Sequence, residues 1–176
     1  ATIFALINAA IFIPYITIVK PTHVDSPKIR AVAINLDFKN SSYEKAASFI
    51  TKSEPQLLIL EELTETWKDG LKKTLAKFPY FVRLRYANAY PIEEDSLKPF
   101  RGIVEKHKMS LGLFSKLPFE NSKLGQFETY PIPYVMGQFK FNGKPFTLFG
   151  AHLVAPISST LSKVRKKDMA VLIDQI

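Results

Sequence analysis

The chain has 176 residues, of which 47% are hydrophobic and 23% are charged. This composition is that of a globular protein with one sizeable core, and it excludes a disordered or low-complexity chain. There is no cysteine, so a disulfide framework and a thiolate metal site are excluded. The formal net charge of +8 is compatible with an anionic partner such as nucleic acid, phospholipid or a phosphate ester. It is equally compatible with lysines that only keep the surface soluble.

The first nineteen residues carry no charge. A helix of that length would span roughly 28 Å, close to the thickness of the hydrocarbon core of a bilayer. We therefore expect a transmembrane or membrane-anchor helix at residues 1–20 and a linker at residues 21–28; a helix buried in a protein core is the alternative. The basic residues Lys20, Lys28 and Arg30 favour a cytoplasmic position for the rest of the chain.

Strands and helices alternate in the next part of the chain. Short apolar runs predict buried strands at residues 29–35 and 56–62. Between them, the capping-box pattern of Ser41 and Glu44 predicts a helix that stops before Pro55. A second helix is expected from residue 64 to about residue 77, because large apolar side chains recur there at intervals of four.

Strands dominate the second half of the chain. Residues 80–86 alternate like a half-buried strand, and the Asn142-Gly143 pair predicts a hairpin between strands 134–141 and 144–151. The last helix is expected to start near Ser159 or Ser162. The irregular stretch at residues 87–101 is a candidate for substrate selection.

Three of the apolar runs end on a polar side chain, namely Asn35, Glu62 and His152. A polar group at the end of a buried strand is costly unless it is solvated, paired or bound to a ligand. In α/β proteins, ligands bind at the carboxyl ends of strands. An amide, a carboxylate and an imidazole that converge at such an edge suggest a metal-and-phosphate site.

These motifs and their order resemble those of the endonuclease/exonuclease/phosphatase superfamily. Residues 33–35 match its strand ending in Asn, and residues 58–62 match its strand ending in Gln-Glu, with Glu61 in place of Gln. Residues 109–118 match its Ser-Arg-x-Pro strand, with Lys116 in place of Arg. His152 and the following leucine match its His-Leu motif, and Pro156 lies shortly beyond.

The resemblance covers residues 29–176 and implies an α/β fold. The fold expected is the DNase-I-like four-layer sandwich of two mixed β-sheets flanked by helices, preceded by the apolar N-terminal helix. The family's later Gly-Asp-x-Asn and Asp-His motifs do not occur in the chain. We therefore expect an incomplete domain that lacks its C-terminal portion, has low stability alone and is catalytically inactive alone.

The resemblance also implies roles for the three strand-end residues. Glu62 would bind Mg²⁺ or Mn²⁺, Asn35 would help to order the metal and the phosphate, and His152 would contact the scissile phosphate. Each residue has a structural alternative. Glu62 would be a carboxylate favoured at a helix N-terminus, Asn35 a cap for the loop after the first strand, and His152 a hydrogen-bonded core histidine. Glu61 is the poorer metal ligand, because adjacent strand residues point to opposite faces.

Other polar residues are expected to have no catalytic role. Arg165 is expected to pair structurally, and His23 and His107 are expected at the surface. The function implied by the resemblance is a membrane-anchored, metal-dependent phosphoesterase of the bacterial inner membrane. It would hydrolyse phosphodiesters or phosphomonoesters, in nucleic acid, phospholipid or a small phosphoester, by in-line attack of water. The alternatives are a non-catalytic remnant or binding module of the same fold and a basic nucleic-acid-binding domain. No protein partner is predicted.

Overall fold

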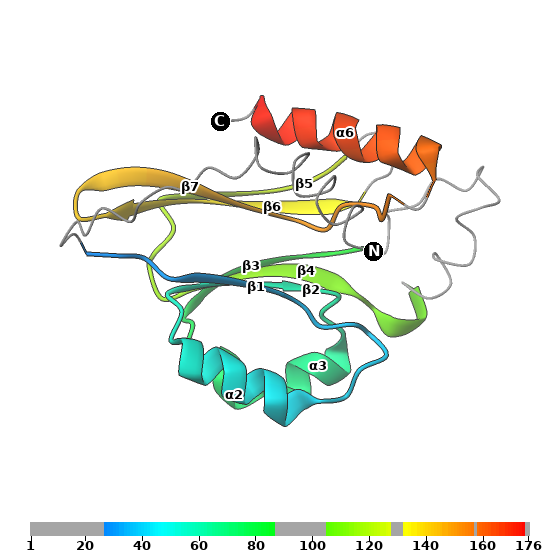
Figure 1. Ribbon diagram of the computed structural model, residues 1–176. Coiled ribbons are helices and arrows are strands. Elements are labelled where there is room, and N and C mark those ends of the chain that lie inside the picture. The colour runs from blue at the N-terminus through cyan, green and yellow to red at the C-terminus, as the bar shows by residue number, and fades with distance from the viewer. Residues whose placement is uncertain (1–26, 87–104, 128–131, 157, 175–176) are drawn as a thin grey trace, which may run out of the picture.

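The computed structural model describes residues 27–86, 105–127, 132–156 and 158–174. Four layers are stacked in the order helices, sheet, sheet, helix (Figure 1). The helices α2 (Tyr43–Ser53), α3 (Glu65–Gly70) and α4 (Lys72–Leu75) cover the first sheet. The helix α6 (Ser159–Ile173) covers the second sheet. The predicted four-layer α/β sandwich is confirmed.

The first sheet is mixed and has the strand order β1-β2-β4-β3. Strands β1 and β2 are parallel, and β4 runs antiparallel to both of its neighbours, β2 and β3. The bounds are β1 Ala31–Asn35, β2 Leu57–Glu61, β3 Tyr80–Arg85 and β4 Ser110–Ser115. The second sheet is antiparallel over the described residues and consists of β5 (Asn121–Gln126), β6 (Pro133–Phe141) and β7 (Lys144–Ala151).

Strand β2 lies at the centre of the packing. Its side chains alternate between two cores, since successive strand residues point to opposite faces. Leu57 and Ile59 belong to the core between the two sheets. Leu58 and Leu60 belong to the core between the first sheet and its helices, where Trp67 is 1% exposed. A strand buried on both faces needs an unbroken apolar run, which is what residues 57–60 supply.

The predicted hairpin is confirmed: Asn142 and Gly143 have φ values of 50° and 78° and join β6 to β7. The single helix predicted from residue 64 to about residue 77 is wrong, because it divides into α3 and α4 after Gly70. A Cβ at Gly70 would lie 2.6 Å from the ring of Tyr43, so the close approach of α2 requires glycine there. The capping box is also wrong, since α2 begins after Ser42, which makes no side-chain cap.

No helix in the described part of the chain is long and apolar enough to cross a membrane. The anchor predicted at residues 1–20 lies outside the described residues, as do His23 and the irregular stretch at residues 87–101. The last helix begins at Ser159, one of the two predicted starts. Ser158 caps it, because its hydroxyl oxygen accepts a hydrogen bond from the backbone N–H of Leu161 at 3.2 Å.

Candidate functional site

The three strand-end residues lie together at one edge of the sandwich. Asn35 ends β1, Glu62 follows the end of β2, and His152 follows the end of β7. Because β1 and β2 are parallel, their carboxyl ends reach the same edge of the first sheet. Two sheets therefore contribute to the site, and the loop after each strand is free to adopt the geometry that the polar group requires.

The Glu62 carboxylate is held by two hydrogen bonds from the loop and strand of β1. Asn35 donates from Nδ2 to Oε1 at 3.0 Å, and the backbone N–H of Phe38 donates to Oε2 at 3.1 Å. The side chain is 18% exposed. With one donor on each oxygen, the carboxylate has a defined orientation and keeps free lone pairs for a further ligand.

Backbone strain accompanies this arrangement. Glu62 has a φ of 55°, in the left-handed region that non-glycine residues seldom adopt. Asp37, in the loop that donates to Glu62, also has a positive φ, of 53°. Such conformations cost about 1–3 kcal/mol each and concentrate at functional sites. The turn at Glu62 breaks the alternation of β2, so adjacent residues no longer need to point to opposite faces.

The Asn35 amide orients Glu62. Its Oδ1 accepts the backbone N–H of Asp37 at 2.9 Å, which leaves Nδ2 to face the carboxylate. Asn35 thus caps the loop after β1 and also orients the Glu62 carboxylate. Its predicted roles toward a metal ion and a phosphate stay predictions.

A second carboxylate joins the site. Glu61 has the same strand parity as Leu57 and Ile59, so it faces the second sheet, where Nδ1 of His152 lies 2.8 Å from its Oε2. Nε2 of His152 lies 3.9 Å from Oε1 of Glu62. Glu61 was predicted only as a poor metal ligand, and its pairing with His152 was not foreseen.

Aromatic rings flank the site. The Tyr86 ring lies edge-on to the His152 ring, with centroids 5.6 Å apart. His107, expected at the surface, packs half-buried against Phe38, with ring centroids 5.0 Å apart. Arg165 donates to the carbonyl of Val154 at 3.4 Å. It therefore holds the loop after His152, which agrees with the structural role expected for it.

The donor set fits a hard divalent cation. Mg²⁺ prefers oxygen ligands and often takes only one or two carboxylates, with water completing its shell. The oriented carboxylate of Glu62 could supply such a ligand, and the Glu61 carboxylate lies on the adjacent residue. Within the described residues, no group of three or more histidine, aspartate or glutamate side chains is arranged to hold a metal.

Neither protein-family models nor curated proteins match the sequence. Solved structures do resemble the fold. TDP2 from D. rerio, complexed with a single-strand DNA product, superposes with a TM-score of 0.61 at 16% identity, over 85% of this chain and 55% of that chain. For TDP2 from Caenorhabditis elegans the TM-score is 0.62 at 13% identity, over 98% and 48% of the two chains.

A bacterial structure resembles the chain as well. The endonuclease/exonuclease/phosphatase from Bacteroides vulgatus has a TM-score of 0.54 at 11% identity, over 86% of this chain and 62% of that chain. The chain thus spans about half to three-fifths of the length of these structures. Two sheets between outer helices, the strand order and these superpositions agree: the chain has the DNase-I-like fold of the endonuclease/exonuclease/phosphatase superfamily.

Proposed function

We propose that this chain is the part of a metal-dependent phosphoesterase that holds the metal ion and contacts the scissile phosphate. The observation that carries the proposal is the oriented carboxylate of Glu62, which faces His152 where the carboxyl ends of two parallel strands meet. The DNase-I-like fold supports it, because the superfamily that shares this fold contains phosphoesterases. The substrate would be a phosphate ester in nucleic acid, phospholipid or a small molecule.

Each side chain has a separate task in this proposal. Glu62 holds Mg²⁺ or Mn²⁺, which would offset negative charge on the phosphate when bound. Asn35 keeps the Glu62 carboxylate aimed at the site. His152 donates a hydrogen bond from Nε2 to a phosphate oxygen. Because Nδ1 faces Glu61, the ring must carry both protons in this role, and the Glu61 carboxylate balances the resulting charge.

The substitution Glu62→Gln tests the proposal, because it keeps the size of the side chain and removes the charge. In the full-length protein we expect it to lower Mg²⁺- or Mn²⁺-dependent hydrolysis of bis-p-nitrophenyl phosphate by on the order of 100-fold. Binding of Mn²⁺, followed by water-proton relaxation, should weaken in parallel. The matched control is Glu120→Gln, which alters an exposed carboxylate away from the strand-end residues.

Two results would contradict the proposal. Equal hydrolysis by wild type and Glu62→Gln would remove Glu62 from the chemistry. Metal binding that depends on Glu62, without hydrolysis of any phosphate ester by the full-length protein, would instead indicate a non-catalytic binding module of the same fold.

Membrane anchoring forms a separate part of the proposal. It rests only on the uncharged run at the start of the chain, and the bacterial inner membrane is the compartment proposed. Carbonate extraction of the full-length protein, with and without residues 1–20, tests it. We expect the intact protein to stay with the membrane and the shortened one to be released; release of both would exclude an anchor.

A further inference from the structure

Strand β3 presents a row of one aromatic and two basic side chains on the face that meets the helices. Successive strand residues alternate between faces. Val82 packs into the core between the two sheets, so Phe81, Arg83 and Arg85 face the opposite side. These three residues extend over about 13 Å along the strand. The row lies at the edge of the first sheet, since β3 is its last strand.

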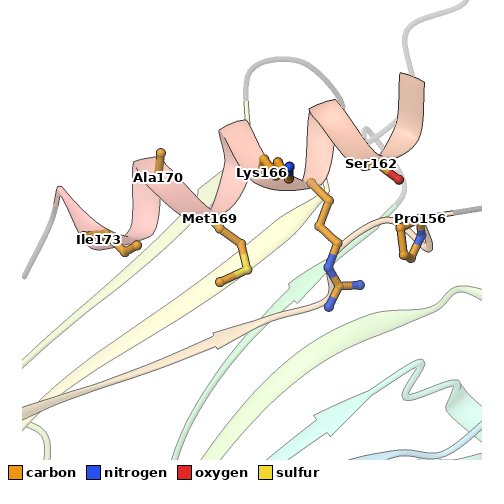
Figure 2. Close-up of a pocket in the computed structure, with 7 residues that line it drawn as sticks. Pro156, Ser162, Lys166, Met169, Ala170 and Ile173 are labelled. Atoms are coloured by element: carbon orange, nitrogen blue, oxygen red, sulfur yellow. The ribbon is translucent and has the colours of Figure 1, made fainter. Parts of the chain in front are cut away.

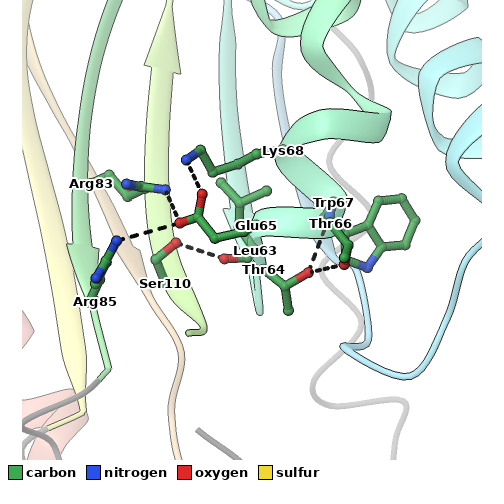
Figure 3. Close-up of polar contacts among 9 residues, drawn as sticks. All are labelled: Leu63, Thr64, Glu65, Thr66, Trp67, Lys68, Arg83, Arg85 and Ser110. Atoms are coloured by element: carbon green, nitrogen blue, oxygen red, sulfur yellow. Dashed lines mark hydrogen bonds and ion pairs between the residues drawn. The ribbon is translucent and has the colours of Figure 1, made fainter. Parts of the chain in front are cut away.

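One carboxylate organises the cations beside this row (Figure 3). Glu65 lies 2.5 Å from Lys68 Nζ, 3.4 Å from Arg83 Nη1 and 3.6 Å from Arg85 Nη2. The hydrogen bond from Lys68 lowers the pKa of Glu65, so this carboxylate stays ionised at neutral pH. Three cations share one negative charge, which leaves the cluster with an excess of two positive charges.

A groove of about 370 Å³ adjoins the cluster, between β3 and the α3–α4 segment. Three cations and no carboxylate are among its lining residues, which are Lys68, Lys72, Leu75, Ala76, Phe78, Phe81, Arg83 and Phe114. Phe81 is 62% exposed, and its ring stacks on Phe114 with centroids 5.8 Å apart and an interplanar angle of 20°. The groove therefore combines an exposed aromatic face with a positive rim.

We propose that this groove binds single-stranded nucleic acid. A nucleobase would stack on the exposed face of Phe81, and the phosphates beside it would meet Lys68, Lys72 and Arg83. Aromatic platforms with cations alongside are the means by which proteins bind single strands without sequence preference. An anionic headgroup alone would satisfy the cations and leave the ring of Phe81 in water, so the pairing of ring and charge favours a nucleic acid.

The position of the groove relates it to the candidate site. Strand β3 runs parallel to β2, because both are antiparallel to β4. Its carboxyl end at Arg85 thus lies at the same edge of the sheet as Glu62. A single-stranded nucleic acid bound in the groove would extend along Phe81, Arg83 and Arg85 toward that edge. This delivery rests on the proposed phosphoesterase function; binding in the groove does not.

Binding is tested on the full-length protein by fluorescence anisotropy with a labelled oligothymidylate of about 12 nucleotides. A chelator is added, so that neither metal nor hydrolysis contributes. We expect Phe81→Ala to weaken binding about tenfold and Phe81→Trp to retain it, because stacking is what the ring supplies. The double substitution Lys72→Gln and Arg83→Gln should lower the slope of log K against log salt by about 1.4.

Matched controls come from α2, which carries an exposed phenylalanine of its own. Phe49 is 54% exposed, and neither it nor the exposed Lys45 lines the groove. We expect Phe49→Ala and Lys45→Gln to bind like wild type. Circular dichroism and thermal melting identify any variant that fails to fold. If Phe81→Ala fails to fold, the salt dependence of the Lys72→Gln and Arg83→Gln double variant still tests the groove.

The outcomes separate this inference from the proposed function. Unchanged oligonucleotide affinity in Phe81→Ala and in the double variant would contradict the proposal that the groove binds nucleic acid. Variants that lose binding to phosphatidylserine-rich vesicles but still bind the oligonucleotide would contradict it as well. Hydrolysis of bis-p-nitrophenyl phosphate should be the same in wild type and groove variants. Oligonucleotide binding that depends on Phe81, in a protein that hydrolyses no phosphate ester, would support the groove and reject the phosphoesterase.

Discussion

The central strands of the first sheet and the helix α6, which covers the second sheet, are packed to very different degrees. In the first sheet, four of the five residues of β2 and all six residues of β4 are buried. In α6, only Val164 and Asp168 of fifteen residues are buried. Met169 and Ile173 are 44% and 62% exposed, and a hollow of about 430 Å³ beside them is lined by Pro156, Ser162, Arg165, Lys166, Met169, Ala170 and Ile173 (Figure 2).

This difference divides the candidate site into two parts. Glu62 and Asn35 belong to the densely packed half, where neighbouring strands and Phe38 define their geometry. His152 belongs to the other half, where its ring contacts the Glu61 carboxylate and Arg165 donates a hydrogen bond to the backbone of the following loop. The arrangement indicates that the Glu62 carboxylate is the rigid reference point of the site. The His152 ring is positioned beside it through its contact with Glu61.

The largest difference between the halves should appear on truncation of apolar side chains. Leu58 is fully buried between the first sheet and its helices, so Leu58→Ala should lower the free energy of unfolding by about 2–5 kcal/mol. Met169→Ala, on the exposed side of α6, should change it by about 0.5 kcal/mol or less. Urea denaturation of the two variants measures both values. Similar losses would show that α6 is packed as tightly as the first sheet.

A smaller effect of opposite sign is expected within α6. Asp168 is 1% exposed, and its Oδ2 has no hydrogen-bond partner among the described residues. Burial raises its pKa, against the opposing charge of Lys167. The ionised carboxylate is therefore a destabilising group, and Asp168→Asn should raise the free energy of unfolding at pH 7 by about 1 kcal/mol.

The pH dependence of this effect follows from the direction of the shift. A carboxyl group with a raised folded-state pKa stabilises the fold below its unfolded value of 3.8 and loses that contribution as pH rises through the folded pKa. The advantage of Asp168→Asn should thus be full at neutral pH and shrink as pH falls toward 4. A difference between variant and wild type that is constant from pH 7 to pH 4 would mean that Asp168 has the same pKa in the folded and the unfolded state, which would contradict the raised pKa.

The sequence predicts the strands and the strand-end residues well, because both depend on local patterns. A run such as residues 57–60 must be buried on both faces, and the polar residue after it must lie at the edge. The break at Gly70 and the strand β5 depend instead on tertiary contacts. Gly70 is required by the ring of Tyr43, and β5 has no apolar alternation, since it forms by pairing with β6. The contact between Glu61 and His152 joins residues 91 positions apart, which no local pattern encodes.

The left-handed backbone at Glu62 has a consequence for how such chains evolve. Glycine or asparagine would occupy a φ of 55° with less strain than glutamate does. A directed-evolution experiment that rewards heat resistance alone should therefore replace Glu62, while one that rewards metal binding should retain it. Under the proposed function, the residue at position 62 would then indicate which of the two selections a variant has passed through.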